Sequence, residues 1–327
     1  ASENYNEWEN LTQLVGENEA KDICNFLLEN CAVSVITMPQ KRLSEAFQLF
    51  DSQNNRGKAL EPHDLLKAYH LREMKKYPYE MKHAVTKWED KDTKQISELF
   101  DLYLFPILNW SRGIKSKPFK IKEIDSYKGI SEESTYTYAK RVSRGMPYFQ
   151  ITEPFIAGND FFKMVEHYIY LLQDIKSEIC NNPSFKEIKK VICNDKNIEK
   201  TEEMSKVNFN SAGFRYTKNL FYCALLYYYD KFHNFDEMAV KKLFLWAFMI
   251  RVDMKSLGFD SINNYAIGDE KNPKYTNKIA MFSKISFARI HNEISRLQIK
   301  VRKESDPGNK EWYDLLKKSM DIEVPNE

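Results

Sequence analysis

Glycine is scarce in this chain, and its spacing limits what the chain can fold into. The 327 residues contain 10 glycines, and the closest two are Gly258 and Gly268. Walker A loops and G-x-G-x-x-G turns need glycines only two to five residues apart, so neither loop can form here. Proline is also sparse at 11 residues, while 43% of the chain is hydrophobic. The sequence therefore predicts a globular, helix-dominated protein without a conventional phosphate loop.

Charge and cysteine content narrow the setting of the chain. The 49 Lys and Arg residues against 47 Asp and Glu leave a formal net charge of +2. This balance argues against a protein that coats nucleic acid, because such proteins carry a strong basic excess. The 5 cysteines form no C-x-x-C motif, which argues against a disulfide framework or a structural zinc site and favours the reducing cytoplasm. The apolar runs 220–229 and 243–250 are about half a bilayer span, so we expect buried helices and no membrane partner.

The amino-terminal segment predicts a longer parent protein. It begins ASENYNEWEN, without an initiator Met or an apolar signal region, so we interpret the chain as an excised piece. The β-branched run CAVSVITMP at 31–39 predicts a strand. A single strand needs neighbours that satisfy its backbone, and few other strand signals are present. Its partners are therefore expected in weakly marked segments or outside the chain.

Helical periodicity dominates the remaining sequence. One helix is expected at 18–30, another at 41–50, and a third begins at Pro62. After Pro78 the pattern is one of long amphipathic helices, and the helix that starts after Asp92 is expected to kink or end at Pro106. Gly158 precedes another long helix. Further helices are predicted at 184–193, 215–232, 237–256, 275–302 and 309–319. The fold class is mainly α: a multi-helical domain at 78–327 follows a segment, 1–77, with one or few strands.

The loop and helix start at 49–71 hold the sharpest cluster of candidate binding residues. Asn54 supplies amide donors, Arg56 a planar guanidinium and Gly57 an unobstructed backbone, which together suit a phosphate or carboxylate beside a helix amino terminus. Asp64 and Lys67 follow one helical turn later. In the alternative interpretation Asn54 and Gly57 shape a turn, Arg56 pairs with Asp64, and Asp64 with Lys67 forms a surface pair.

A known family shares this pattern. Phe50, Asn54, Arg56-Gly57-Lys58, Leu60 and Asp64-Leu65-Leu66-Lys67 resemble the second signature block of the GmrSD-type restriction-enzyme amino-terminal domain. The resemblance covers about thirty residues, extended weakly by CAVSVITMP and by QITEPFIAGNDFF at 150–162.

The resemblance implies a ParB-like sensor module, of which 1–77 would be the carboxyl-terminal part. In the intact protein this module would bind or hydrolyse a nucleoside triphosphate with a divalent metal, and 78–327 would link it to a His-Asn-His nuclease that cuts modified phage DNA in bacteria. Asn54, Arg56, Gly57, Asp64 and Lys67 would line or support the nucleotide pocket. The family's Asp-Gly-Gln-Gln-Arg block and nuclease signature do not occur here. We therefore expect no catalytic residue, metal ligand or cofactor within this chain, and a nuclease domain or subunit as partner.

A second candidate surface is the basic stretch 110–150. It holds nine Lys or Arg residues against four Asp or Glu, with aromatic residues interleaved, as expected of a surface that contacts phosphates and stacks bases. In the alternative interpretation the stretch is a solvated connector whose aromatic side chains pack on neighbouring helices. The candidate nucleic-acid contacts are Arg112, Lys115, Lys117, Lys120, Lys122, Lys140, Arg141 and Arg144.

Two functions from different classes follow. The first is a fragment of a nucleotide-regulated, modification-dependent defence nuclease, inactive by itself. The second is a non-catalytic helical module that binds DNA or a partner protein.

Overall fold

The structure is a computed structural model of the full chain. It describes residues 13–32, 61–135, 149–193, 202–269, 271, 274–275, 278–299 and 309–320. The chain divides into two compact units, Ala1–Gln53 and Asn54–Glu327. The expected boundary between 1–77 and 78–327 stays a prediction.

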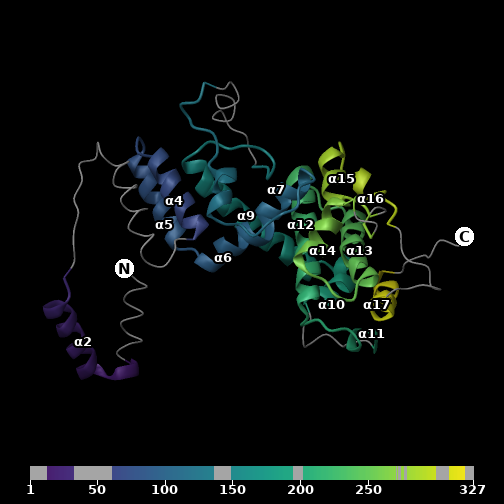
Figure 1. Ribbon diagram of the computed structural model, residues 1–327, viewed down its shortest axis with the longest axis horizontal. Coiled ribbons are helices and arrows are strands. Elements are labelled where there is room, and N and C mark those ends of the chain that lie inside the picture. Colours follow the sequence, from purple (N-terminus) through teal and green to yellow (C-terminus); the bar gives the residue numbers. More distant parts are fainter. Residues whose placement is uncertain are drawn as a thin grey trace, which may run out of the picture. The chain divides into compact units, whose positions relative to one another are not determined.

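The described part of the first unit is helical. Helix α2 spans Glu17–Asn30, which confirms the helix expected at 18–30 (Figure 1). Most of its side chains are exposed, and Ala20 is buried. The expected strand at 31–39 and the helix at 41–50 lie outside the described residues, apart from Cys31 and Ala32, which belong to no regular element.

The first helices of the second unit pack around a group of aromatic side chains. Phe161 of α9 stacks on His70 of α4 and on Trp88 of α5, with ring centroids 4.1 and 5.7 Å apart. Phe161 is fully buried, so it joins three helices at one point. The elements are α4 (Pro62–Glu73), α5 (Pro78–Glu89), α6 (Thr93–Glu98), η2 (Leu99–Leu104), α7 (Phe105–Ser111), η3 (Ile121–Tyr127) and α9 (Asn159–Asn181).

Pro106 does not end the helix that precedes it. Helix α6, the π-helical turn η2 and α7 follow one another directly, and the backbone N–H of Phe105 donates to the carbonyl of Phe100. Because proline has no N–H, a wider turn just before it lets the helix continue without an i to i−4 bond at that position. The expectation that the helix ends at Pro106 is therefore wrong, whereas the alternative expectation of a kink there stays a prediction.

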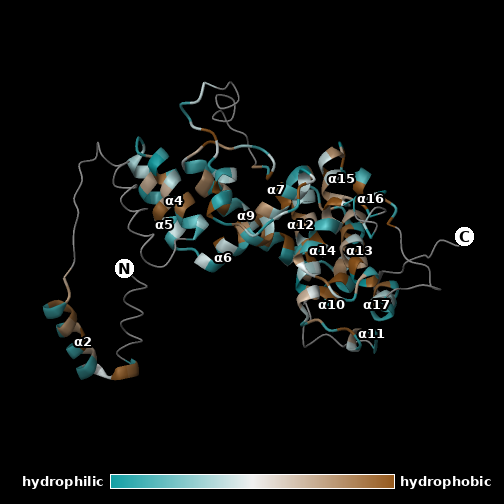
Figure 2. Ribbon diagram, viewed as in Figure 1, coloured by the Kyte–Doolittle hydropathy of each residue, from teal (hydrophilic) through white to brown (hydrophobic). Residues whose placement is uncertain are grey.

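The carboxyl-terminal helices form the most apolar part of the protein. Helix α13 is buried around nearly its whole circumference and packs along α12 and α17 (Figures 1 and 2). A helix that is apolar on all sides belongs in a core. The elements are η4 (Pro183–Phe185), α10 (Lys186–Cys193), α11 (Glu202–Ser205), α12 (Ala212–Phe232), α13 (Glu237–Asp253), α14 (Phe259–Ile267), α15 (Met281–Phe287), α16 (Asn292–Ser295) and α17 (Lys310–Met320).

The prediction of a single helix at 275–302 is wrong. Helices α15 and α16 are separate, and the Glu293 side chain accepts hydrogen bonds from the backbone N–H groups of Arg289 and Ile290 at 2.8 and 3.2 Å. This carboxylate satisfies the backbone of the break, as a capping residue does. Helix α14 was not expected.

The mainly α fold class is confirmed. In the described ranges, β-type pairing is limited to one isolated parallel bridge between Ile130 and Ile156. Among the described helices, none combines the length and the apolar character needed to cross a membrane.

Candidate functional site

The basic strip, defined here as Arg112, Lys115, Lys117, Lys120 and Lys122, is anchored at its start by Asn263 of α14. The Asn263 side-chain oxygen accepts hydrogen bonds from Trp110 Nε1 at 2.8 Å and from the backbone N–H of Ser116 at 2.7 Å. Its Nδ2 donates to the Ser116 carbonyl at 3.0 Å. The buried amide of Asn263 thus holds the backbone of the strip in one position from both its oxygen and its nitrogen.

A second anchor holds the strip at Phe119. Its backbone N–H donates to the Asp101 carboxylate at 2.8 Å, and its ring stacks on Phe100 with centroids 5.2 Å apart. Trp110 and Tyr127 are buried as well. These rings pack inside the protein, as the alternative interpretation of the stretch expected, and are not placed to stack bases. Tyr136, Tyr138 and Tyr148 lie outside the described residues.

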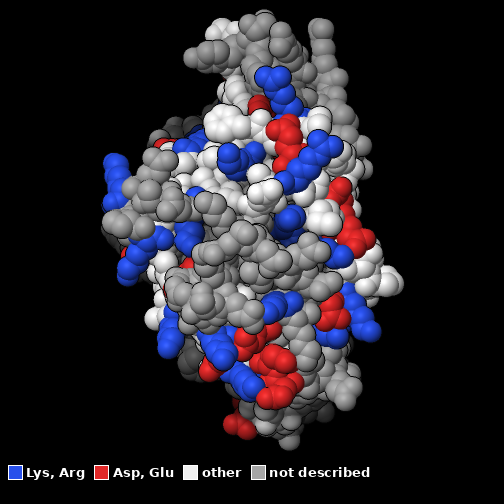
Figure 3. Space-filling model, turned by 90° about the vertical axis from the view of Figure 1, so that its right-hand side faces the viewer, with Lys and Arg blue, Asp and Glu red and all other residues white. Residues whose placement is uncertain are grey.

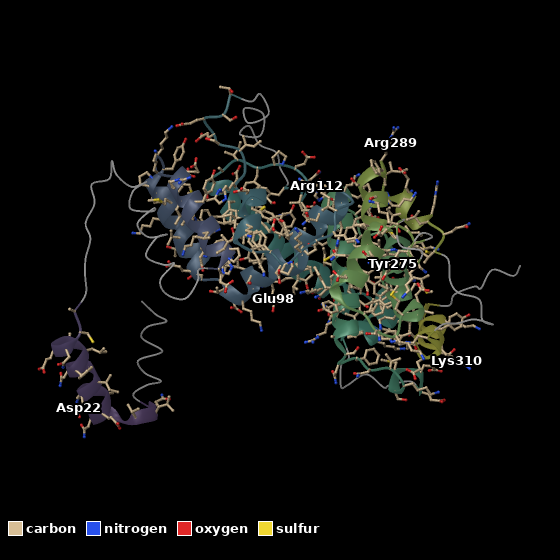
Figure 4. All side chains as sticks on the ribbon, viewed as in Figure 1. Asp22, Glu98, Arg112, Tyr275, Arg289 and Lys310 are labelled. Carbon is tan, nitrogen blue, oxygen red and sulfur yellow. The ribbon has the colours of Figure 1, made fainter. Side chains whose placement is uncertain are left out.

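The cations of the strip differ in their partners. Lys115 pairs with Asp269 at 3.0 Å. Lys117, Lys120 and Lys122 are exposed and form no ion pair within the described part of the chain, and the same holds for Arg112 at the end of α7 (Figure 4). Lys140, Arg141 and Arg144 lie outside the described residues.

The start of α4 and the basic strip meet at one groove, called the strip groove below. It has a volume of about 640 Å³, and its walls include Glu61, His63, Asp101, Lys120 and Lys122. His63 is buried, and its Nε2 has no hydrogen-bond partner. Burial lowers the pKa of His63, against the opposing effect of Asp64 and Glu61. The structure thus brings the start of α4 and the basic stretch together, although they are far apart in the sequence.

Asp64 and Lys67 have structural partners instead. Asp64 accepts a hydrogen bond from the backbone N–H of Glu61 at 3.3 Å and completes the capping box of α4. Lys67 pairs with Glu89 of α5 at 3.4 Å, not with Asp64. Neither residue lines the strip groove. Asn54, Arg56 and Gly57 lie outside the described residues.

Sequence reasoning missed a buried polar junction around His70. The backbone N–H of Gly158 donates to His70 Nδ1 at 3.0 Å, so Nε2 carries the proton and donates to the Tyr127 carbonyl at 2.9 Å. Burial lowers the pKa of His70 to about 3. The neutral ring therefore joins α4, η3 and the start of α9. The signal was available: His63, Leu66 and His70 recur at i, i+3 and i+7 on one buried face.

Asp230 organises a second part of this junction. Its carboxylate accepts hydrogen bonds from the Tyr168 hydroxyl at 2.7 Å and from the backbone N–H of Ile151 at 2.8 Å. Burial raises the pKa of Asp230 to about 7. In the sequence Asp230 is the one acid that continues the apolar face of α12, which marks it as a buried polar group.

The residues that the structure describes include no group of three or more His, Cys, Asp or Glu placed to hold a metal ion. What the fold and the site define is a helical protein with a rigid, partly unpaired basic strip beside a groove.

Comparison with known proteins then gives its family. The chain belongs to a family of unknown function, DUF7834, whose model matches residues 80–314. No curated protein and no solved structure matches the chain.

The family match corrects the resemblance to the GmrSD-type restriction-enzyme domain. The matching model is that of a different family, and no GmrSD-type model matches. A short block of loop and helix residues is a weak basis for membership, because turn residues and a capped helix start recur in unrelated proteins. The nucleotide, metal and nuclease roles that depended on the resemblance are withdrawn with it.

Proposed function

We propose that this chain is a non-catalytic helical binding module that holds the phosphate backbone of DNA on the basic strip. The observation that carries the proposal is that four cations of the strip are exposed and lack an acidic partner within the described part of the chain. Arg112, Lys117, Lys120 and Lys122 are exposed, and none has an acidic partner among the described residues. Four uncompensated cations close together in one segment create a local positive potential, which favours a polyanionic partner.

The anchoring of the strip strengthens this reasoning. Asn263 and Asp101 fix its backbone at Ser116 and Phe119, so the lysines between and beyond these points project from a rigid segment. A rigid row of cations loses less conformational entropy on binding than a mobile one. The face drawn in Figure 3 carries Lys and Arg interspersed with Asp and Glu, whereas the strip residues 112–122 include five cations and no acid. The strip is therefore the better candidate for a phosphate contact.

The burial of the aromatic rings decides what kind of contact is proposed. Trp110, Phe119 and Tyr127 are committed to the core, so the strip offers charge without stacking platforms. Binding through charge alone reads the backbone and not the bases. Glu61, Asp101 and Glu123 line the strip groove, so the phosphates are expected to lie along the lysines and not inside the groove. We also infer a reducing compartment, because the described cysteines Cys24, Cys31 and Cys223 form no disulfide.

The test is salt-dependent binding of a fluorescent DNA duplex by the full chain. Replacing Lys117, Lys120 and Lys122 by Gln is expected to weaken binding and to reduce the slope of log K against log salt by about 0.9 for each phosphate that the variant no longer neutralises. The matched control replaces Lys82, Lys186 and Lys310, which are exposed and form no ion pair within the described residues, by Gln. Equal weakening in both triple variants, or no binding by the parent at low salt, would refute the proposal.

A further inference from the structure

Arg251 of α13 is a buried cation without an acidic partner in the described part of the chain. Only 7% of the residue is exposed, and burial lowers the pKa of its guanidinium, with no acid of the described residues acting in the opposite direction. The nearest acid along α13, Asp253, pairs with Lys278 at 2.6 Å. A buried charge is normally paired with an opposite one. Arg251 therefore lacks the partner that its burial requires.

The donors of this guanidinium are only partly used. Nη1 donates one long hydrogen bond, of 3.4 Å, to the carbonyl of Lys255. Nε is buried and has no partner, and Nη2 forms no hydrogen bond with the described residues either. Unlike Nε, Nη2 is not among the fully buried atoms that lack a partner. Nη2 is therefore the free donor that water or a ligand can reach.

Two groups hold the guanidinium in place without using these donors. Its Cζ lies over the ring of Trp312 of α17, 5.3 Å from the centroid. On the α12 side, a Cβ added to Gly213 would lie 2.4 Å from Nη1 and 3.3 Å from Cζ, so the guanidinium fills the space that any other side chain would need. The ring face stabilises the positive charge, while the N–H groups lie in the guanidinium plane. The cation is therefore preorganised.

The guanidinium lies at the amino-terminal end of α12. Gly213 is the second residue of this helix, and Cα–Cβ bonds of a helix tilt towards its amino terminus, so Arg251 lies on that side. Ser211 caps the N–H of Phe214, but the N–H groups of Ala212 and Gly213 have no partner among the described residues, and the first turn contains no acid. A helix amino terminus carries a partial positive charge. Two positive groups thus lie together at this point.

We propose that the α12 corner, defined as Ala212, Gly213 and Arg251, binds a phosphate group, either the free ion or the monoester of a small molecule. Nη2 of Arg251 and the free N–H groups of α12 would hold its oxygens. A tetrahedral oxyanion presents acceptors in several directions, so it accepts from a guanidinium and a helix amino terminus together. Ala212 and Lys255 are exposed, so the corner lies at the surface. The proposal does not rest on DNA binding, because the corner shares no residue with the basic strip.

The test is thermal unfolding of the full chain in inorganic phosphate, compared with sodium chloride at the same ionic strength. A ligand that binds only the folded protein raises the melting temperature. Phosphate is expected to raise it more than chloride does, with half-saturation at or below about 10 mM, since weak affinity suffices for so small a ligand. Arg251→Gln is expected to weaken phosphate about tenfold or more, the usual size of a hydrogen bond to a charged group. Arg296→Gln is the matched control, because Arg296 is exposed and forms no ion pair within the described residues.

Gly213→Ala tests the corner while Arg251 is kept. The added Cβ displaces the guanidinium, and alanine favours a helix more than glycine does, so the variant should fold and lose the effect of phosphate. Gly258→Ala is the matched control and should keep the effect, because its added Cβ would meet nothing within 4 Å. The strip variant of the DNA test should keep it as well. If Arg251→Gln does not fold, Gly213→Ala decides the question.

Glycine-selective ¹⁵N labelling places the site. The chain has 10 glycines, so the spectrum is simple. The amide signal of Gly213 is expected to shift and saturate with phosphate, whereas that of Gly113 reports contacts at the strip. Phenyl phosphate distinguishes the two sources: a monoester site binds it at least as tightly as phosphate, and a site for the free ion binds it more weakly. The proposal would be overturned by a phosphate effect no larger than that of chloride, by an unchanged effect in Arg251→Gln or Gly213→Ala, or by a Gly213 signal that does not shift.

Discussion

The α12–α13 pair and the His70 junction are both buried, yet different contacts hold them. Between α12 and α13 the contact is apolar: Phe244 of α13 meets Phe221 of α12 edge to face at 5.5 Å, and within α13 it stacks on Phe248 at 4.5 Å. At the junction, His70 and Asp230 form hydrogen bonds with backbone groups of segments distant in the sequence. Apolar contacts tolerate small shifts, whereas a buried hydrogen bond demands one geometry.

This difference accounts for a cavity that lies at the junction. Helices with apolar faces slide together until the gaps between them close, as close packing of interiors requires. The junction instead joins η3 to the segment 149–158. In this segment no regular helix or strand satisfies the backbone N–H and C=O groups. Side chains such as Asp230 take over that role and hold the segments apart at fixed distances. That cavity, with Tyr127 and Tyr168 in its walls, adjoins these segments.

The largest effect is expected from truncating the apolar pair. Phe244→Ala removes a fully buried ring, and the removal of a phenylalanine ring from a core costs about 3–5 kcal/mol in the free energy of unfolding. Urea unfolding monitored by circular dichroism measures the change. Phe287→Ala is the control, because 83% of Phe287 is exposed and its truncation should cost less than about 0.5 kcal/mol. Similar costs in both variants would show that the pair is not a packed core.

Helices could be predicted from the sequence where the apolar pattern extends over several helical turns. The helices α2, α9 and α17 follow from the 3.6-residue repeat of their apolar residues, and α12 and α13 follow from their long apolar runs. The break between α15 and α16 could not be predicted, because it depends on two hydrogen bonds that the Glu293 side chain accepts from backbone N–H groups. Periodicity records which faces are buried and not which side chain satisfies a backbone group, so short helices joined by such contacts merge into one predicted helix.

The candidate site was predictable only in its charges. The strip lysines are neighbours in the sequence, so their clustering is visible there. Their anchor Asn263 is not visible there, because it lies 153 residues from Trp110 and 147 from Ser116. The burial of the interleaved aromatic rings was one of two interpretations, and residue types alone do not choose between them. Tertiary packing determines which of the two interpretations holds, and it buries the described rings.

A smaller effect should separate backbone strain from close packing at the junction. Gly129 has φ of +67°, and an added Cβ would lie 2.7 Å from the carbonyl oxygen of Phe155. Gly113 has nearly the same φ, +69°, but nothing within 4 Å of an added Cβ. Both alanine variants bear the cost of a left-handed residue, and only Gly129→Ala forces Phe155 away. Thermal unfolding should show an additional cost of about 1–3 kcal/mol for Gly129→Ala. Equal costs would mean that the packing of 128–131 on 155–157 is loose.

The smallest effect is a pair of opposing pH dependences at the junction, one from His70 and one from Asp230. The folded-state pKa of His70, about 3, lies below its usual 6.5, so the unfolded chain takes up this proton first. His70 therefore makes the free energy of unfolding fall as the pH drops from 6.5 towards 3. The folded-state pKa of Asp230, about 7, lies above its usual 3.8, so the folded protein holds this proton while the unfolded chain has released it. Asp230 makes the free energy of unfolding fall as the pH rises from 3.8 towards 7.

Between about pH 4.5 and 6 the two dependences oppose each other, each with a slope of at most about 1.4 kcal/mol per pH unit. His70→Gln should leave the Asp230 dependence, so stability relative to the parent should fall with rising pH. Asp230→Asn should do the reverse, and the double variant should run parallel to the parent. Urea unfolding across this range reads the slopes, so the pH-independent cost of each substitution drops out. If the free energy of unfolding of both single variants had the same pH dependence as that of the parent, His70 and Asp230 would not be buried as described. The junction would then not differ from the apolar helix pair in the way argued above.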